Sequence, residues 1–283
     1  MITGFDNGAP VLQPAKRPLT LRLLLSHTSG LAYTIWDADL DRYSKTPGAK
    51  TGLLVPLVTQ PGTRWQYSTG IDVAGKIVEK VSGQTLQAYF QQNIFGPLGM
   101  KDTSYDVDPA KLDRLGTIHQ RDAAGVLTER PFAAPAKSTS YAGGGGLYST
   151  AADYVRFMQM ILNGGRAGGR RILQEASIAE MTKNQIGELQ VRTMRSTNPM
   201  ASNDFEFHAG AGDKFGLGFQ INGTPYEKGR KAGSLAWAGA ANTFFWIDPN
   251  SQRCAVLLTQ ISPFFDVEAV KLLGEFEQAV YPK

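Results

Sequence analysis

The fold is decided by the stretch WAGAANTFFWIDPNSQRCAVLLT at residues 237–259. Residues 242–247 are rich in β-branched and aromatic side chains, and residues 254–259 form a continuous apolar run, so both segments are expected to be strands. The tetrapeptide Asp-Pro-Asn-Ser at 248–251 separates them and is typical of a turn. The two strands are therefore expected to pair antiparallel.

The residues on either side of this hairpin continue the same architecture. Every second residue from 215 to 221 is apolar, which predicts another strand. Asp266 can cap a C-terminal helix whose apolar side would cover one face of the sheet. We therefore expect residues 215–283 to form antiparallel strands with a C-terminal helix.

The region before these strands, residues 20–214, is predicted to be mainly helical. Thr20, Thr85 and Thr150 are N-cap candidates for three helices. The apolar spacing of residues 70–81 predicts a fourth helix, which would begin just after Tyr67.

Breaks in the helical pattern come from glycine and proline. The helix capped by Thr85 should stop before the Gly-Pro pair at 96–97, and residues 98–141 carry mostly loop signals.

Residues 1–19 are expected to form a weak hairpin around an Asn-Gly turn, followed by a connector. Helices followed by strands, without βαβ alternation, indicate an α+β fold and argue against a dinucleotide-binding one.

Composition excludes several classes of protein. The 283 residues are 42% hydrophobic, which is enough for a sizeable core. The net charge of +4 comes from basic residues scattered along the chain, which argues against a nucleic-acid-binding protein. The single cysteine, Cys254, excludes an intramolecular disulfide and zinc clusters built on cysteine. No apolar run approaches the ~20 residues that span a bilayer, and no signal-peptide pattern follows Met1. We expect a cytoplasmic protein that binds neither nucleic acid nor membrane.

Several catalytic motifs are absent from the sequence. It has neither a G-x-S-x-G elbow nor an H-E-x-x-H zinc motif. The three histidines, His27, His119 and His208, are far apart in sequence, which does not forbid a Ser-His-Asp site but gives it no positive support. The glycine run at 143–146 lacks the Gly-Lys-Ser/Thr ending of a phosphate-binding loop. It is better explained as a loop whose backbone packs closely.

Six phrases taken together resemble one family. They are LLSHTSGL at residues 24–31, QPGT at 60–63, YST at 67–69, PLGMKDT at 97–103, GGGGLYST at 143–150 and WAGAANT at 237–243. In this order and spacing they are similar to the serine β-lactamase and penicillin-binding superfamily, and most of all to its class C-like esterases, the family VIII carboxylesterases. The resemblance covers nearly the whole chain. It implies a β-lactamase/transpeptidase-like fold, with an antiparallel sheet flanked by helices beside a largely helical region.

The resemblance also implies roles for particular residues. In that family an acyl-enzyme forms on the serine of a Ser-x-x-Lys pair, a tyrosine moves protons, and two backbone N–H groups hold the oxyanion. Tyr67 is implied to be the proton-transfer residue. Trp237, Ala238 and Gly239 are implied to form the strand beside the substrate, and the N–H of Ala240 to hold the oxyanion.

A second alignment of this strand is possible, because the phrase KAGS at residues 231–234 is closer in residue identity to the family's Lys-Thr-Gly motif than the phrase that begins at Trp237. We prefer the alignment on Trp237, because the phrase NTFFWIDP at 242–249 follows it as it does in the esterases.

Two departures from the family pattern concern the substrate. Trp237 stands where a lysine would pair with a substrate carboxylate, and Thr69 replaces an asparagine that would engage the acylamino group of a β-lactam. The resemblance therefore implies hydrolysis of small, neutral, short-chain carboxylic esters through an acyl-enzyme, without cofactor or metal. Efficient hydrolysis of antibiotics is not expected.

A third departure concerns the nucleophile, since no serine of this chain has a lysine three residues later. In the family this pair lies upstream of the region that resembles residues 24–31, on a helix packed against the sheet, together with the first strands. We therefore expect residues 1–283 to be the C-terminal portion of an esterase, arising from a truncated gene, a mis-called start or a separate N-terminal chain. The expected partners are a second chain that supplies the missing N-terminal part, or further copies of this chain in a homo-oligomer. Without a neighbouring ammonium group, Tyr67 should be a neutral phenol at pH 7.

Two alternatives to a hydrolase stay open. One is an inactive fragment or ligand-binding pseudoenzyme of the same fold, and the other is an acyltransferase that uses the same residues.

Overall fold

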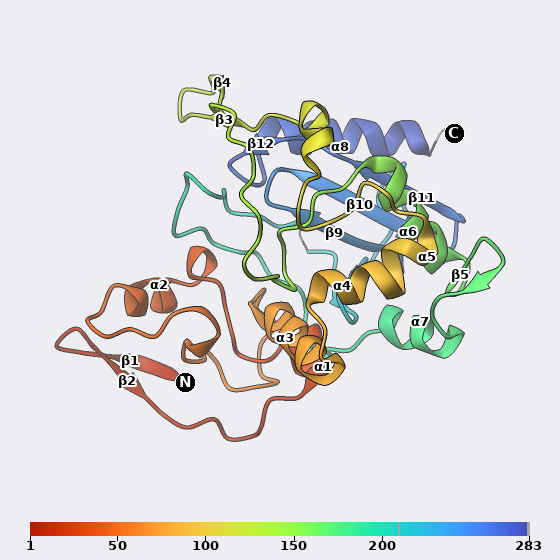
Figure 1. Cartoon of the computed structure of the whole chain (residues 1–283). Helices are drawn as coiled ribbons and strands as arrows, with labels where there is room; N and C mark the ends of the chain where they lie inside the picture. The colour runs from red at the N-terminus through yellow and green to blue at the C-terminus, as the bar shows by residue number, and fades with distance from the viewer. Residues whose placement is uncertain (209, 282–283) are drawn as a thin grey trace.

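A five-stranded antiparallel sheet organises the computed structural model, which describes residues 1–208 and 210–281 (Figure 1). Its strand order is β11-β10-β9-β8-β7. The strands are β7 (Lys214–Phe215), β8 (Gln220–Ile221), β9 (Leu235–Gly239), β10 (Thr243–Asp248) and β11 (Arg253–Leu257).

The predicted hairpin is confirmed as β10 and β11. They pair antiparallel from Phe244 opposite Leu257 to Asp248 opposite Arg253, across the predicted turn. The prediction of one strand over residues 215–221 is wrong, because the chain turns there and forms β7 and β8. Gly218 has a φ of +91°, which glycine tolerates and an extended strand does not use.

Two helices cover the two faces of the sheet (Figure 1). Helix α6 (Ala151–Leu162) packs on the face that presents Phe245 and Ile247. Helix α8 (Val267–Val280) lies on the other face, where the rings of Phe276 and Trp246 are 5.6 Å apart. Both predicted caps are confirmed: the Thr150 hydroxyl accepts from the N–H of Asp153, and the Asp266 carboxylate accepts from the N–H of Ala269.

The remaining helices precede the sheet in sequence. They are α1 (Leu21–Leu25), α2 (Ala38–Ser44), α3 (Gly70–Ser82), α4 (Leu86–Phe90), α5 (Gly96–Leu98) and α7 (Glu175–Thr182). The predicted stop before Gly96 is wrong: a π-helical turn at Gln91–Phe95 leads into α5, and Gly99 ends it with a φ of +67°. Pro97 is tolerated because it lies in the first turn of α5, where its missing N–H costs no hydrogen bond.

Small hairpins complete the fold. β1 (Ile2–Asp6) pairs with β2 (Ala9–Leu12) as predicted, and β5 (Arg166–Ala167) pairs with β6 (Arg170–Arg171). Residues predicted as loop contain β3 (His119–Arg121) and β4 (Leu127–Glu129), and β12 (Ile261–Ser262) adds to β3 in parallel. Strands thus also occur within residues 20–214, and the division of the chain into three regions stays a prediction.

The observed mixture of helices and antiparallel sheets confirms the α+β class.

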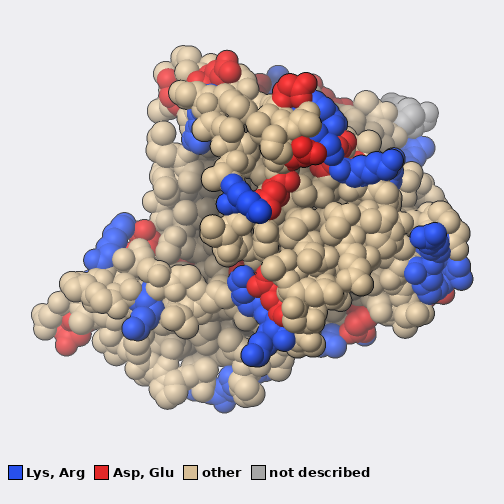
Figure 2. Space-filling view, in the orientation of Figure 1, with Lys and Arg blue, Asp and Glu red and all other residues tan. Residues whose placement is uncertain are grey.

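Acidic and basic side chains are interspersed on the face shown in Figure 2, with one basic cluster over the β5–β6 hairpin. Within the described residues, no helix combines the length and the apolar character needed to cross a membrane.

Candidate active site

Tyr67 lies in the loop that leads into α3, beside the end of α1. The N–H of Gln66 donates to the carbonyl of His27 at 2.8 Å, and the N–H of Gly62 donates to the carbonyl of Thr28 at 2.7 Å. These bonds hold the phrase at residues 24–31 against the segment that carries Tyr67. Two of the phrases that suggested the family are therefore neighbours in space.

The structure brings Tyr67 and Trp237 into contact. Their ring centroids are 4.9 Å apart, and the planes are inclined by 61°. The indole N–H of Trp237 also favours the ionised form of the Tyr67 phenol and so acts to lower its pKa. Residues separated by most of the sequence thus form one side-chain pair.

The other predicted strand residues follow Trp237 along β9. Ala238 and Gly239 complete the strand, and Ala240 is the exposed first residue of the turn to β10. β8 pairs only with Leu235 and Ala236, so from Trp237 onward the β9 edge opposite β10 has no strand partner among the described residues. This open edge is where an N–H group can point at a substrate oxygen.

The competing alignment on Lys231 falls outside the sheet. Residues 231–234 form the turn before β9, and Lys231 is exposed. Trp237, by contrast, lies within the strand and pairs across it with Phe245.

His27 is a member of this cluster that the sequence analysis did not assign to the site. Its ring is buried, and its centroid lies 4.8 Å from that of Tyr67 and 6.2 Å from that of Trp237. Nδ1 accepts from the N–H of Ser68 at 3.3 Å. Burial lowers the pKa of His27 to about 3, so the imidazole is neutral at pH 7. The available signal was its position within the phrase at residues 24–31.

Tyr33 and Asp72 also extend the site beyond the prediction. The Tyr33 hydroxyl donates to Oδ2 of Asp72 at 3.2 Å, and the ring centroid of Tyr33 lies 5.1 Å from that of Tyr67. Tyr33 and Asp72 both affect the pKa of Tyr67, so the three side chains belong to one site.

The pKa of Tyr67 is raised above its ordinary value. Burial is the largest cause and the negative charge of Asp72 adds to it, while the hydrogen bonds with Trp237 and Tyr33 oppose the rise. Among the described residues no cationic side chain acts on Tyr67. Tyr67 is therefore a neutral phenol at pH 7, as the missing ammonium led us to expect.

The glycine run at 143–146 packs against the start of α3, as predicted for a close-packed loop. A Cβ at Gly143 would overlap the carbonyl oxygen of Ile71, and a Cβ at Gly144 would lie 2.7 Å from the Tyr33 hydroxyl. The N–H of Gly144 donates to Oδ1 of Asp72 at 2.8 Å. The loop thus fixes the carboxylate that accepts from Tyr33.

Aromatic side chains surround the pair of Tyr67 and Trp237. The ring of Trp36 lies 5.2 Å from that of Tyr67, and those of Phe215 and Phe207 lie 5.3 and 5.7 Å from that of Trp237. No group of three or more His, Cys, Asp or Glu side chains able to hold a metal occurs in the part of the chain that the structure describes. The site thus combines the phenolic proton of Tyr67, the indole N–H of Trp237 and the open edge of β9, and aromatic side chains surround these groups.

Comparison with known proteins identifies relatives of the whole chain. The family model described as Beta-lactamase matches residues 8–277. An uncharacterised protein of Mycobacterium tuberculosis is 32% identical over 273 residues, which cover 90% of this chain and 66% of that protein. The chain thus spans about two thirds of the length of that relative.

Two curated fungal relatives carry functional names. Monacolin J acid methylbutanoyltransferase of Aspergillus terreus is 29% identical over 99% of this chain and 71% of its own length. Lovastatin esterase of Penicillium rubens is 28% identical over 90% of this chain and 68% of its own length. Among solved structures, a mutant of simvastatin synthase from Aspergillus terreus superimposes with a TM-score of 0.81 at 28% identity, covering 99% of this chain and 71% of that one.

Proposed function

Because the chain belongs to the beta-lactamase family, whose relatives here include an esterase and acyltransferases, we propose that its site transfers the acyl group of a neutral carboxylic ester through a serine acyl-enzyme. In this proposal Tyr67 handles the proton of the nucleophile and of the leaving alcohol. The open edge of β9, ending at Ala240, holds the oxyanion.

The observation that carries the proposal is the contact between Tyr67 and Trp237, with ring centroids 4.9 Å apart. A proton donor and an oxyanion-binding strand edge must both reach one acyl carbon, because the leaving oxygen and the oxyanion are both bonded to it. The contact supports the proposal, because it sets Tyr67 beside the residue of β9 from which the strand edge is unpaired.

The charges around the site favour a neutral substrate. The side chains that pack on Tyr67 and Trp237 are aromatic, and His27 is neutral at pH 7. The negative charge of Asp72 is close enough to raise the pKa of Tyr67, and it repels a substrate carboxylate in the same way. Trp237 adds an apolar wall with one N–H donor. We therefore assign small neutral esters as the substrates, and hydrolysis of short acyl chains as the reaction.

Transfer to an alcohol in place of water uses the same groups, and two observations support it as a second candidate. The first is that the relatives named above include a methylbutanoyltransferase beside the esterase. The second is the set of aromatic rings around Tyr67 and Trp237. These rings lower the local concentration of water and so favour an alcohol as the acceptor of the acyl group.

The nucleophile is assigned to residues outside this sequence. The 283 residues contain no Ser-x-x-Lys pair. An ammonium group placed beside Tyr67 would lower the pKa of the phenol and offset both burial and the charge of Asp72. The role of Tyr67 as a proton acceptor depends on that charge.

The test uses the product of the complete reading frame that contains these residues, assayed with 4-nitrophenyl butyrate. We expect a burst of nitrophenol equal to the protein concentration. Tyr67→Phe should lower kcat/KM by about 10²-fold or more, the range of general acid–base catalysis. Tyr89→Phe is the matched control, because Tyr89 lies on α4 and its hydroxyl makes no hydrogen bond within the described residues.

Two results would contradict the proposal. One is a Tyr67→Phe variant that keeps its activity within twofold of the unmodified protein. The other is stoichiometric labelling of a serine within the 283 residues by a fluorophosphonate. Saturable ester binding without product would instead support the ligand-binding pseudoenzyme, and product analysis with added alcohol separates hydrolysis from acyl transfer.

A further inference from the structure

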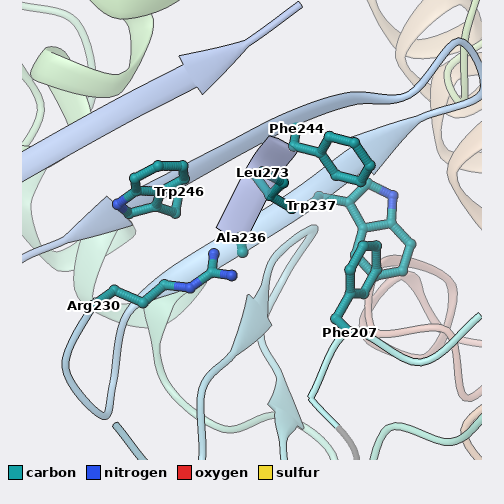
Figure 3. A pocket seen from close by; sticks show the side chains of 7 residues that line it. All are labelled: Phe207, Arg230, Ala236, Trp237, Phe244, Trp246 and Leu273. Carbon is teal, nitrogen blue, oxygen red and sulfur yellow. The ribbon is translucent and has the colours of Figure 1, made fainter. Parts of the chain in front are cut away.

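Two adjoining cavities lie on the α8 side of the sheet, away from Tyr67. The smaller one is bordered by Ala236, Phe244 and Trp246 of the sheet (Figure 3). The larger one, of about 190 Å³, extends along α8. Arg230 lines both cavities, together with Phe207 and Leu273.

The guanidinium group of Arg230 is buried and only partly satisfied. The residue is 4% exposed, and its guanidinium carbon lies 4.4 Å from the ring centre of Tyr226 and 5.5 Å from that of Trp246. Its Nε lies 3.3 Å from Oε1 of Glu277 without the geometry of a hydrogen bond, and it has no hydrogen-bond partner among the described residues. Oε1 of Glu277 instead accepts from the backbone N–H of Arg230 at 2.9 Å.

A buried arginine with an unused donor favours a ligand that supplies an acceptor. Polar groups removed from water are destabilising unless they are hydrogen-bonded, and a carboxylate matches the planar guanidinium with two parallel bonds. The two aromatic rings hold the guanidinium in place and so reduce the entropy lost on binding.

The rest of the larger cavity suits a hydrocarbon chain. Phe207, Phe265, Val270 and Leu273 line it, and Lys228 and Glu227 lie among its charged lining residues. Gly274 of α8 also lines the cavity, and a Cβ built there meets no atom within 4 Å. Gly274 is exposed, so the cavity that begins at the buried guanidinium opens to solvent beside this residue.

We propose that this cavity binds an amphipathic monocarboxylate, with the carboxylate on Arg230 and the alkyl chain along α8. The site is separate from the acyl-transfer chemistry proposed for Tyr67. Trp237 borders the smaller cavity and also contacts Tyr67, so that one side chain lies between the two sites.

The test is isothermal titration of the protein with octanoate, and with 1-octanol as the probe that keeps the chain and removes the charge. We expect octanoate to bind saturably and at least tenfold more tightly than octanol. Equal affinity for the two probes would contradict the role of Arg230, and no saturable binding of octanoate would overturn the site.

Two variants locate the binding. Gly274→Leu places a side chain in the open space and should weaken octanoate binding at least tenfold, whereas Glu275→Leu, at an exposed α8 residue outside the cavity lining, should leave it unchanged. The double variant Arg230→Gln/Glu277→Gln removes the two charges together and should bring octanoate to the affinity of octanol. Unchanged octanoate affinity in Gly274→Leu would overturn the proposal, even if the double variant fails to fold.

Discussion

The hydroxyl of Tyr33 donates to Oδ2 of Asp72 at 3.2 Å, and this bond connects the site to the first turn of α3. Asp72 is the acidic residue of that turn, where a negative charge is favoured by the helix dipole. The same charge raises the pKa of Tyr67. A residue placed to stabilise a helix start thus also affects the protonation of the proposed catalytic phenol.

Replacing Asp72 should make Tyr67 easier to ionise. Asp72→Asn removes a negative charge that disfavours the phenolate, so the pKa of Tyr67 should fall. Spectrophotometric titration of tyrosinate measures it, with the signal of Tyr67 taken as the difference between each protein and its Tyr67→Phe counterpart. A pKa of Tyr67 that stays constant or rises in the variant would contradict the assigned role of Asp72.

Replacing Trp237 should have the opposite effect. Trp237→Phe keeps an aromatic ring against Tyr67 but removes the indole N–H that stabilises the phenolate, so the pKa of Tyr67 should rise further. The same difference titration detects the change. If the pKa of Tyr67 instead fell, the hydrogen bond between the two side chains would not be the dominant interaction.

His27 should make the stability of the protein depend on pH. Burial lowers the pKa of His27 from 6.5 to about 3, so below pH 6.5 the unfolded chain takes up a proton that the folded state does not. This contribution to stability is fully present above pH 6.5 and is lost as the pH falls toward 3, at about 1.4 kcal/mol per pH unit.

The variant His27→Asn isolates this term, because asparagine tolerates the φ of +56° at this position. At pH 7 the variant should be about 2–4 kcal/mol less stable, since it leaves a cavity and a weaker partner for the N–H of Ser68. Urea unfolding at pH 6.5 and 4.5 should show the unmodified protein losing about 2 kcal/mol more than the variant between these pH values. Equal losses would show that His27 is protonated in the folded state.

The glycine run offers a matched pair of substitutions. Gly143→Ala places a Cβ against the carbonyl oxygen of Ile71 and should lower the free energy of unfolding by about 1–3 kcal/mol. Gly145→Ala meets no atom within 4 Å, so its effect should be within about 0.5 kcal/mol. Urea unfolding measures both, and similar effects of the two substitutions would be inconsistent with the packing of this loop on α3.

Local chemistry accounts for what could be predicted from the sequence. The caps at Thr150 and Asp266 depend on residues three positions away, and the β10–β11 hairpin depends on its own turn. The errors arose where distant contacts override the local pattern. At the turn between β7 and β8, for example, the N–H groups of Leu217 and Gly218 donate to the carbonyls of Met181 and Leu25 and not to a neighbouring strand.

The candidate site divides in the same way. Tyr67 and Trp237 were predicted from the phrases around them, and their catalytic roles stay predictions. The sequence analysis considers His27 only for a Ser-His-Asp site and as part of a phrase, and assigns it no role beside Tyr67. Tyr33 and Asp72 are not predicted, because a hydrogen bond between side chains 39 residues apart leaves no periodic pattern in the sequence.

The sequence by itself determined the helix starts at Thr150 and Asp266, the central hairpin, and Tyr67 and Trp237 as candidate site residues, since each depends on neighbours within a few positions. Only the tertiary structure decided that a buried neutral histidine contacts Tyr67 and that a carboxylate raises its pKa, because burial and electrostatic coupling depend on distances that exist only once the chain has folded.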